Sequence, residues 1–106
     1  LVCNTADVSV GAMKQFVIKG ELEVPYILIH LAENEWRAFE QKCTHLSCAV
    51  HYRADIKKIE CPCHKGYFDA RTGVVLQGPP PRPLPQLTVI VSNEQVFVKA
   101  LVENNT

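Results

Sequence analysis

The sequence lacks an excess of either charge, because its 106 residues contain 11 Lys and Arg and 11 Asp and Glu. Proteins that bind nucleic acids or anionic membranes usually carry clustered basic residues, and no basic run here exceeds Lys57 and Lys58. The sequence also lacks a run of about 18 apolar residues, which a membrane-spanning helix needs. These absences disfavour nucleic acid as a partner and predict that the chain as given is soluble.

Helical periodicity is also missing. No window of helical length repeats apolar residues at i, i+3, i+4 and i+7 together with a cap, so at most one turn of helix is expected. Short segments rich in β-branched and aromatic residues, mostly alternating with polar ones, instead predict strands. These segments are residues 15–19, 26–31, 36–40, 87–91 and 96–100. Turn-forming residues separate them, at Gly20 and at residues 33–35, 72–73 and 92–94. The sequence therefore predicts an all-β domain.

The middle of the chain has a different composition. Residues 43–85 contain four of the five cysteines, three of the four histidines and six of the seven prolines. This concentration predicts a single domain, 1–106, in which a subdomain at 43–85 is inserted into an antiparallel sandwich or barrel formed by residues 1–42 and 86–106. The run from Gly78 to Pro81 cannot donate ladder hydrogen bonds and predicts a rigid loop.

Two short motifs within this segment carry metal-binding chemistry. CTHLSC (residues 43–48) and CPCHKG (residues 61–66) each contain two cysteines and one histidine. A structural zinc site of the Cys2His2 type is one interpretation. Two disulfides with incidental histidines are another. Each motif, however, offers a thiolate and an imidazole at short spacing, which suits a two-metal cluster in which one iron takes both thiolates and the other both imidazoles.

The two motifs closely resemble those of the Rieske iron-sulfur family, whose centre is a 2Fe-2S cluster with two histidines in place of two cysteines. The resemblance implies one cluster per chain, with metal ligands Cys43, His45, Cys61 and His64. It further implies that His45 and His64 exchange the proton with the substrate. His30 and His51 are expected to be structural or surface residues instead.

The same resemblance assigns roles to residues around the cluster. It implies a disulfide between Cys48 and Cys63, and it implies that Leu46 shields the cluster. The proline loop of the family, which covers the cluster, corresponds here to Pro79, Pro80 and Pro81. Cys3 then remains as a spare thiol.

The disulfide and the GPPPRPLP segment make the chain most similar to Rieske subunits of bacterial cytochrome bc-type complexes. This resemblance implies an electron-transfer subunit, rather than an enzyme on its own, that accepts an electron and a proton from quinol and passes the electron to a cytochrome. Its partners would be cytochrome b and a c-type cytochrome. It would lie on the extracytoplasmic, periplasmic face of a membrane, with an N-terminal anchor expected before Leu1. A soluble Rieske ferredoxin or an arsenite-oxidase-type small subunit is the alternative.

One departure from the family concerns the redox potential. Many high-potential members place a Ser and a Tyr, which hydrogen-bond to cluster sulfurs, where this chain has Gly66 and Phe68. Tyr67 is adjacent, but in an extended segment it should point to the opposite face. We therefore expect a midpoint potential in the lower or middle part of the Rieske range, which suits menaquinol better than ubiquinol.

Overall fold

The computed structural model describes residues 2–18, 25–41, 48–62, 66–78 and 83–102. Within them the chain is almost entirely β, and its helical content is the single 3-10 turn η1 (Thr5–Asp7). This agrees with the predicted all-β class and with the expected limit of one helical turn. No helix in this part of the chain has the length and apolar character needed to span a bilayer.

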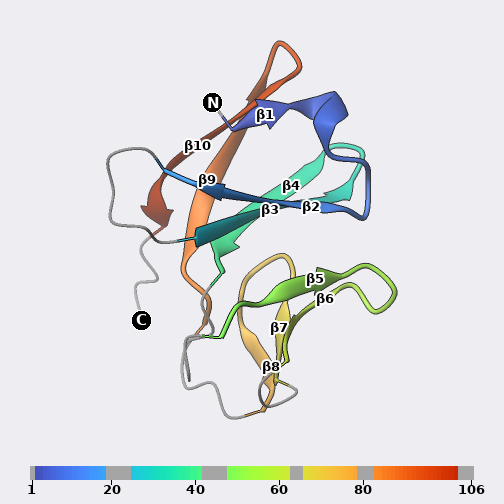
Figure 1. The fold of residues 1–106 in the computed structure, drawn as a ribbon, viewed down its shortest axis with the longest axis vertical. Helices are drawn as coiled ribbons and strands as arrows, with labels where there is room; N and C mark the ends of the chain where they lie inside the picture. The colour runs from blue at the N-terminus through green and yellow to red at the C-terminus, as the bar shows by residue number, and fades with distance from the viewer. Residues whose placement is uncertain (1, 19–24, 42–47, 63–65, 79–82, 103–106) are drawn as a thin grey trace.

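The strands form two sheets, which Figure 1 shows one above the other. The larger one, here called the base sheet, has the order β1-β10-β9-β4-β3-β2. Its strands are β1 (Cys3–Asn4), β2 (Met13–Val17), β3 (Pro25–Ala32), β4 (Glu35–Glu40), β9 (Gln86–Ser92) and β10 (Gln95–Val102). All the pairings between these strands in the described part of the chain are antiparallel.

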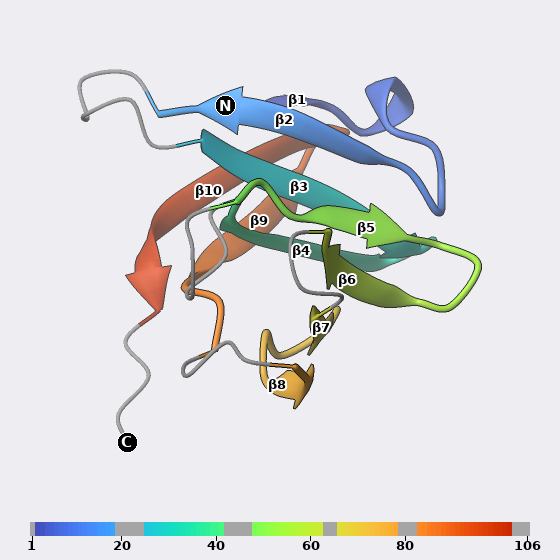
Figure 2. The ribbon, with the colours of Figure 1, turned by 60° about the horizontal axis from the view of Figure 1, so that its bottom comes forward.

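The second sheet, here called the motif sheet, is antiparallel with the order β5-β6-β7-β8. Its strands are β5 (His51–Arg53), β6 (Lys58–Cys61), β7 (Gly66–Asp69) and β8 (Val75–Gln77). Strands β5 and β6 lie next to the two cysteine motifs in the sequence. Figure 2 shows these two strands on the side of the molecule opposite β10. All four strands come from the segment between β4 and β9, so the motif sheet is an insertion between two paired strands of the base sheet.

The five predicted strands are confirmed as β2, β3, β4, β9 and β10, with ends that differ by at most two residues. The turns at Glu33 and Asn34 and at Asn93 and Glu94 are also confirmed, whereas the turn predicted at Gly20 lies outside the described residues. Asn93 and Glu94 have φ values of 50° and 61°. Two consecutive residues with positive φ form the two-residue loop that matches the twist of a tight hairpin, here between β9 and β10.

Strand β3 is buried on both faces, which explains its nearly continuous apolar sequence PYILIHLA. Ile27 and Ile29 face the motif sheet, while Tyr26 and Leu28 face the opposite side. The cluster on the motif-sheet side, here called the shared core, comprises Ile27, Ile29, Phe39, Val50, Ile59, Cys61, Phe68, Ala70 and Leu84. The cluster on the other side, here called the base core, comprises Cys3, Val8, Tyr26, Leu28, Trp36, Ala38, Leu87 and Val96.

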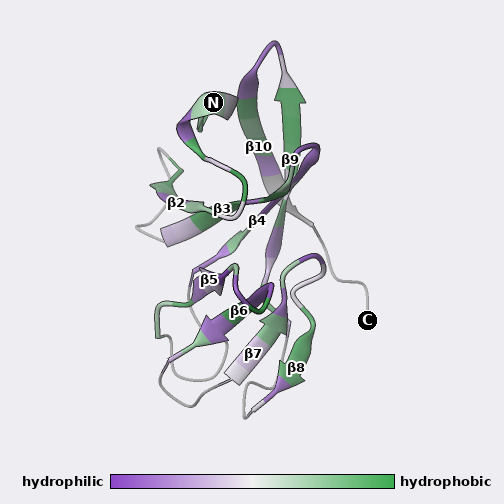
Figure 3. Ribbon diagram, turned by 90° about the vertical axis from the view of Figure 1, so that its right-hand side faces the viewer, coloured by the Kyte–Doolittle hydropathy of each residue, from purple (hydrophilic) through white to green (hydrophobic). Residues whose placement is uncertain are grey.

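The motif sheet has a polar and an apolar part. Figure 3 shows β5 as mainly hydrophilic and β8 as mainly hydrophobic. Strand β8 is an edge strand, and Val74 just before it and Leu76 within it are each 48% exposed. The shared core therefore takes few side chains from β8 itself, with Val75 packed at its margin.

Candidate metal centre

The β6–β7 hairpin places Cys61 in the interior. Along β6, Ile59 and Cys61 are buried while Lys58 is exposed, which is the alternation expected of a strand with one covered face. Cys61 pairs in register with Gly66, and Ile59 pairs with Phe68, which is also fully buried. Residues that pair directly across two strands project to the same face. The thiol of Cys61 therefore lies on the apolar face of the hairpin.

Cys48 lies at the edge of the same apolar environment. It is half-buried and packs against the shared core, which includes Cys61. Just after it, Val50 is fully buried, and its backbone N–H donates to the carbonyl of Gln41 at 2.7 Å. The Gln41 side-chain amide in turn donates to the carbonyl of Val50 at 3.1 Å. The end of the first motif is thus fixed to the end of β4 and directed toward the second motif.

Most of the predicted site lies outside the described residues. This applies to the ligands Cys43, His45 and His64, to Cys63, and to the shielding residues Leu46, Pro79, Pro80 and Pro81. Within the described part of the chain, no group of three or more His, Cys, Asp or Glu side chains could hold a metal ion. The structure therefore brings Cys48 and Cys61 together and leaves the full ligand set as a prediction.

The surroundings of Cys61 suit a thiolate bound to a metal cluster. A charged thiolate in an apolar core is strongly disfavoured unless a metal or an opposite charge compensates for it. The side chains beside Cys61 are apolar, including Phe68, Ile59 and Leu84. An apolar shell around a metal-bound sulfur restricts solvent access and tunes the redox potential. The buried Cys61 sulfur, together with the predicted ligands Cys43, His45 and His64, fits a 2Fe-2S cluster.

The opposite face of the hairpin carries a network of polar side chains that sequence reasoning missed. Glu60 accepts a hydrogen bond from the Tyr67 hydroxyl at 3.1 Å. Its carboxylate also lies 3.0 Å from Nε2 of His51 and 3.5 Å from a guanidinium nitrogen of Arg53. The bond to Glu60 raises the pKa of Tyr67. The alternation of KIEC and GYFD was the available signal, because it places these side chains on one face.

The position of Tyr67 confirms that this hydroxyl points away from Cys61. Its ring lies on the face of β7 opposite Phe68, and its hydroxyl is used by Glu60. Gly66 and Phe68, on the buried face, contain no hydroxyl group. The chain therefore has no hydroxyl donor at positions 66 and 68, and Tyr67 does not replace one.

His30 has the contacts of a packed histidine. Its ring stacks on Trp36 with centroids 3.8 Å apart and planes at 11°. Nδ1 lies 2.8 Å from the carbonyl of Val8, and Nε2 lies 3.2 Å from the carbonyl of Glu33. These contacts tie the first loop to the β3–β4 turn at the end of the base sheet. They agree with the expected structural role.

Cys3 belongs to a different region from the motifs. It is 8% exposed in the base core, where burial raises the pKa of its thiol. Strand β1 pairs it with Val96 of β10. A thiol with a raised pKa is less nucleophilic at neutral pH, so Cys3 has the character of an apolar packing residue.

A family model described as the Rieske [2Fe-2S] domain matches residues 1–88. The cytochrome b6-f complex iron-sulfur subunit of Parasynechococcus marenigrum (strain WH8102) is 43% identical over 63 residues, covering 59% of this chain and 35% of that subunit. The same subunit of Synechococcus sp. (strain RCC307) is 44% identical with equal coverage. The chain thus spans about a third of the length of these curated relatives.

Solved structures with the same fold come from two kinds of protein. The cyanobacterial plasma membrane Rieske protein PetC3 from Synechocystis PCC 6803 has a TM-score of 0.80 and 30% identity, covering 93% of this chain and 97% of that one. A chain in the complex of reduced oxygenase and oxidized ferredoxin in carbazole 1,9a-dioxygenase has a TM-score of 0.78 and 27% identity, covering 92% and 88%. The fold alone therefore does not choose between the two kinds.

Proposed function

Because the chain belongs to the Rieske [2Fe-2S] domain family, we propose that it relays single electrons from a quinol to a cytochrome. The family membership itself establishes an electron-transfer domain that binds a 2Fe-2S cluster. The relay between quinol and cytochrome is supported by relatives that are subunits of cytochrome b6-f complexes. The partners proposed here are cytochrome b and a c-type cytochrome.

The observation that carries the proposal is the convergence of Cys48 and Cys61 on one apolar core. In this proposal Cys43 and Cys61 hold one iron, and His45 and His64 hold the other. When bound, the cluster supplies a one-electron acceptor whose net charge falls from zero to minus one. Cys61 is fully buried, so water does not reach its sulfur. Each of the two histidines keeps its other ring nitrogen available to exchange a proton with the quinol hydroxyl.

We further propose that Cys48 and Cys63 form a disulfide that ties the two motif loops together. Cys48 packs against the shared core that contains Cys61, two residues before Cys63 in the second motif, which supports this pairing. A stable disulfide requires an oxidising compartment, so the domain would work on the extracytoplasmic face of a membrane. In the same proposal the inserted subdomain spans residues 43–85, and Leu46 with residues 79–81 covers the cluster.

A soluble ferredoxin that serves an oxygenase is the second candidate. The structural similarity to a chain from the carbazole 1,9a-dioxygenase complex favours it. Against it stands the second cysteine of each motif, because single-domain Rieske ferredoxins generally lack the disulfide. The presence of Cys48 and Cys63 therefore favours the quinol relay.

A potentiometric titration of the cluster-containing protein, followed by visible circular dichroism, tests this choice. Rieske centres span about −150 to +300 mV, and an electron relay must lie between its donor and its acceptor. We expect a midpoint between the bottom and the middle of this range, because positions 66 and 68 carry no hydroxyl donor. A midpoint at the bottom of the range would favour the ferredoxin, and one at the top would contradict the expectation that the potential suits menaquinol better than ubiquinol.

A further inference from the structure

Glu60 of β6 is a mostly buried carboxylate next to the predicted iron ligand Cys61. Its side chain is 16% exposed, and it lies on the face of the β6–β7 hairpin opposite the Cys61 thiol. Consecutive Cα atoms are about 3.8 Å apart, so the backbone itself holds Glu60 close to this ligand. Charges with little exposure to water are weakly screened by salt. Glu60 therefore places a negative charge near the predicted cluster site.

Side chains from both neighbouring strands hold this carboxylate in place. Its Oε2 accepts from the Tyr67 hydroxyl at 3.1 Å and lies 3.5 Å from Nη1 of Arg53. Its Oε1 lies 3.0 Å from Nε2 of His51. Tyr67 belongs to β7, whereas His51 and Arg53 belong to β5. Glu60 and these three partners are here called the outer network.

The outer network neutralises the charge of Glu60 only in part. Arg53 is its permanent cation, because a guanidinium stays protonated in proteins. The shortest contact of this guanidinium, at 2.6 Å, is made to the carboxylate of Asp55. The ammonium group of Lys58 lies over the Tyr67 ring, 5.9 Å from its centroid. The Arg53 guanidinium is thus shared between two carboxylates.

We propose that Glu60 and Arg53 set the midpoint potential of the cluster through opposite electrostatic effects. Reduction adds one negative charge to the cluster, so a nearby carboxylate opposes it and a nearby guanidinium favours it. Glu60 therefore lowers the midpoint potential, and Arg53 raises it by neutralising Glu60. The inference rests on the proposed role of Cys61 as an iron ligand.

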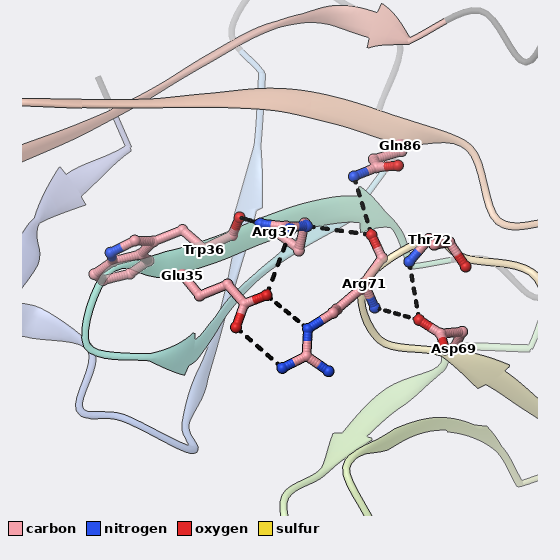
Figure 4. A network of polar contacts seen from close by, with 7 residues as sticks. All are labelled: Glu35, Trp36, Arg37, Asp69, Arg71, Thr72 and Gln86. Carbon is pink, nitrogen blue, oxygen red and sulfur yellow. Dashed lines mark hydrogen bonds and ion pairs between the residues drawn. The ribbon is translucent and has the colours of Figure 1, made fainter.

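A second pair of an arginine and a carboxylate provides a matched control. Figure 4 shows Arg71, in the turn at residues 69–73 here called the junction turn, reaching the first residue of β4. Its guanidinium donates from Nε to one carboxylate oxygen of Glu35 at 2.6 Å and from Nη2 to the other at 3.1 Å. Paired contacts of this kind are the strongest geometry for these two groups. This pair, here called the junction pair, joins the motif sheet to the base sheet.

The junction turn lies at the end of the β6–β7 hairpin that is distant from Cys61. Asp69, its first residue, pairs with Lys58, three positions before Cys61. Three positions correspond to about 10 Å along a strand. Gly73, its last residue, approaches the base sheet, since a Cβ there would lie 2.9 Å from the ring of Phe39. The junction pair thus offers the same kinds of charge as the outer network, farther along the hairpin from Cys61.

Redox titration of the cluster-containing protein, at one pH and one ionic strength for all variants, tests the proposal. Glu60→Gln keeps the shape of the side chain and removes its charge. We expect it to raise the equilibrium constant for reduction about threefold, which is about 28 mV at 59 mV per tenfold change. Arg53→Gln should lower the same constant about twofold, which is about 18 mV.

Two further measurements separate charge from packing. Glu60→Asp keeps the charge but shortens the side chain, so the constant should stay within about 1.5-fold of the wild-type value. Glu35→Gln and Arg71→Gln each remove one charge of the junction pair. The side chains of this pair are 26% and 57% exposed, respectively. Each of these replacements should change the constant by less than about 1.5-fold, because exposed charges are well screened.

The signs of the two main shifts decide the outcome. An unchanged or lower midpoint in Glu60→Gln, or an unchanged or higher midpoint in Arg53→Gln, would overturn the proposal. Equal shifts in Glu60→Asp and Glu60→Gln would also overturn it, because they would show that the shape of the side chain matters and its charge does not. A wild-type midpoint that rejects the quinol relay would leave this comparison intact, because differences between variants require only a bound cluster.

Discussion

The base sheet and the motif sheet are built differently from the same chain. Four base strands have six to eight residues, and the base core is formed by residues of the base region alone. The motif strands have three or four residues, and their buried side chains pack on Ile27, Ile29 and Phe39 of the base sheet. Isolated short strands are marginally stable. The motif sheet thus depends on the base sheet and on its cross-links, while its loops carry the predicted ligands.

Phe39 should show this dependence most strongly. It belongs to β4 but lies in the shared core, beside the position where Gly73 makes its close approach. Phe39→Ala should lower the free energy of unfolding by about 3–5 kcal/mol, because it leaves a cavity between the sheets. Urea denaturation measures the loss. The control is Phe16→Ala, because Phe16 is a half-buried ring that stacks on Tyr26 at the base core. Its replacement should lower the free energy of unfolding clearly less. Equal losses in the two variants would refute the dependence of the motif sheet on the base sheet.

Removal of the proposed disulfide should come next. Replacing Cys48 and Cys63 with Ser would open a loop of about 15 residues, at an expected cost of about 3 kcal/mol in the chain-entropy model. Denaturation of the wild-type protein with and without a reductant should show a similar difference, and the double variant should no longer respond to reductant. A wild-type protein whose stability is insensitive to reductant would contradict the pairing.

A hydroxyl on the buried face of β7 should raise the midpoint potential. Gly66 pairs with Cys61 and is buried, so a Ser there would place its hydroxyl on the face that carries the Cys61 sulfur. A hydrogen bond that favours the reduced state by roughly 1 kcal/mol corresponds to about 40 mV for one electron. Redox titration of Gly66→Ser measures the shift. Thr72→Ser, outside the hairpin, is the control, and equal potentials would show that position 66 does not reach the cluster.

The smallest effect is expected from the pH dependence of the ion pair at the junction. The hydrogen bond from Arg71 lowers the pKa of Glu35 from its ordinary value of 4.5. A carboxyl with a lowered pKa in the folded state stabilises the fold above its unfolded pKa, and this contribution is lost as the pH falls through the folded pKa. Glu35→Gln should therefore lose less stability than the wild type between about pH 6 and pH 3. The free energy of unfolding, measured by chemical denaturation at each pH, checks this. If it falls equally with pH in the wild type and in Glu35→Gln, the prediction is contradicted.

The base sheet was predictable from sequence because its strands are long enough for alternation and β-branched residues to appear. The run at residues 26–31 is an example, although its burial on both faces emerges only from the pairing of the sheets. The motif sheet was less predictable. Its segment at Tyr67 was expected to be extended, but a strand of three residues such as His51–Arg53 carries too little pattern between motif residues to define its bounds.

The candidate site also contains residues that the sequence predicts and residues that it does not. The cysteines and histidines are recognisable because their spacing within each motif reflects local chemistry. Arg71 gives no such signal, because its partner Glu35 is 36 positions away and the pairing follows from how the two sheets pack. Glu60 is similar, since its contact with Tyr67 requires the β6–β7 register.

Pulsed electron-nuclear double resonance on the reduced protein, labelled with nitrogen-15 at histidine, tests the central claim most directly. We expect a paramagnetic centre with strong couplings to two histidine nitrogens, both retained when His30 or His51 is replaced. A centre without such couplings would indicate cysteine ligands alone. A colourless, diamagnetic protein that binds one zinc would contradict the proposed cluster site altogether.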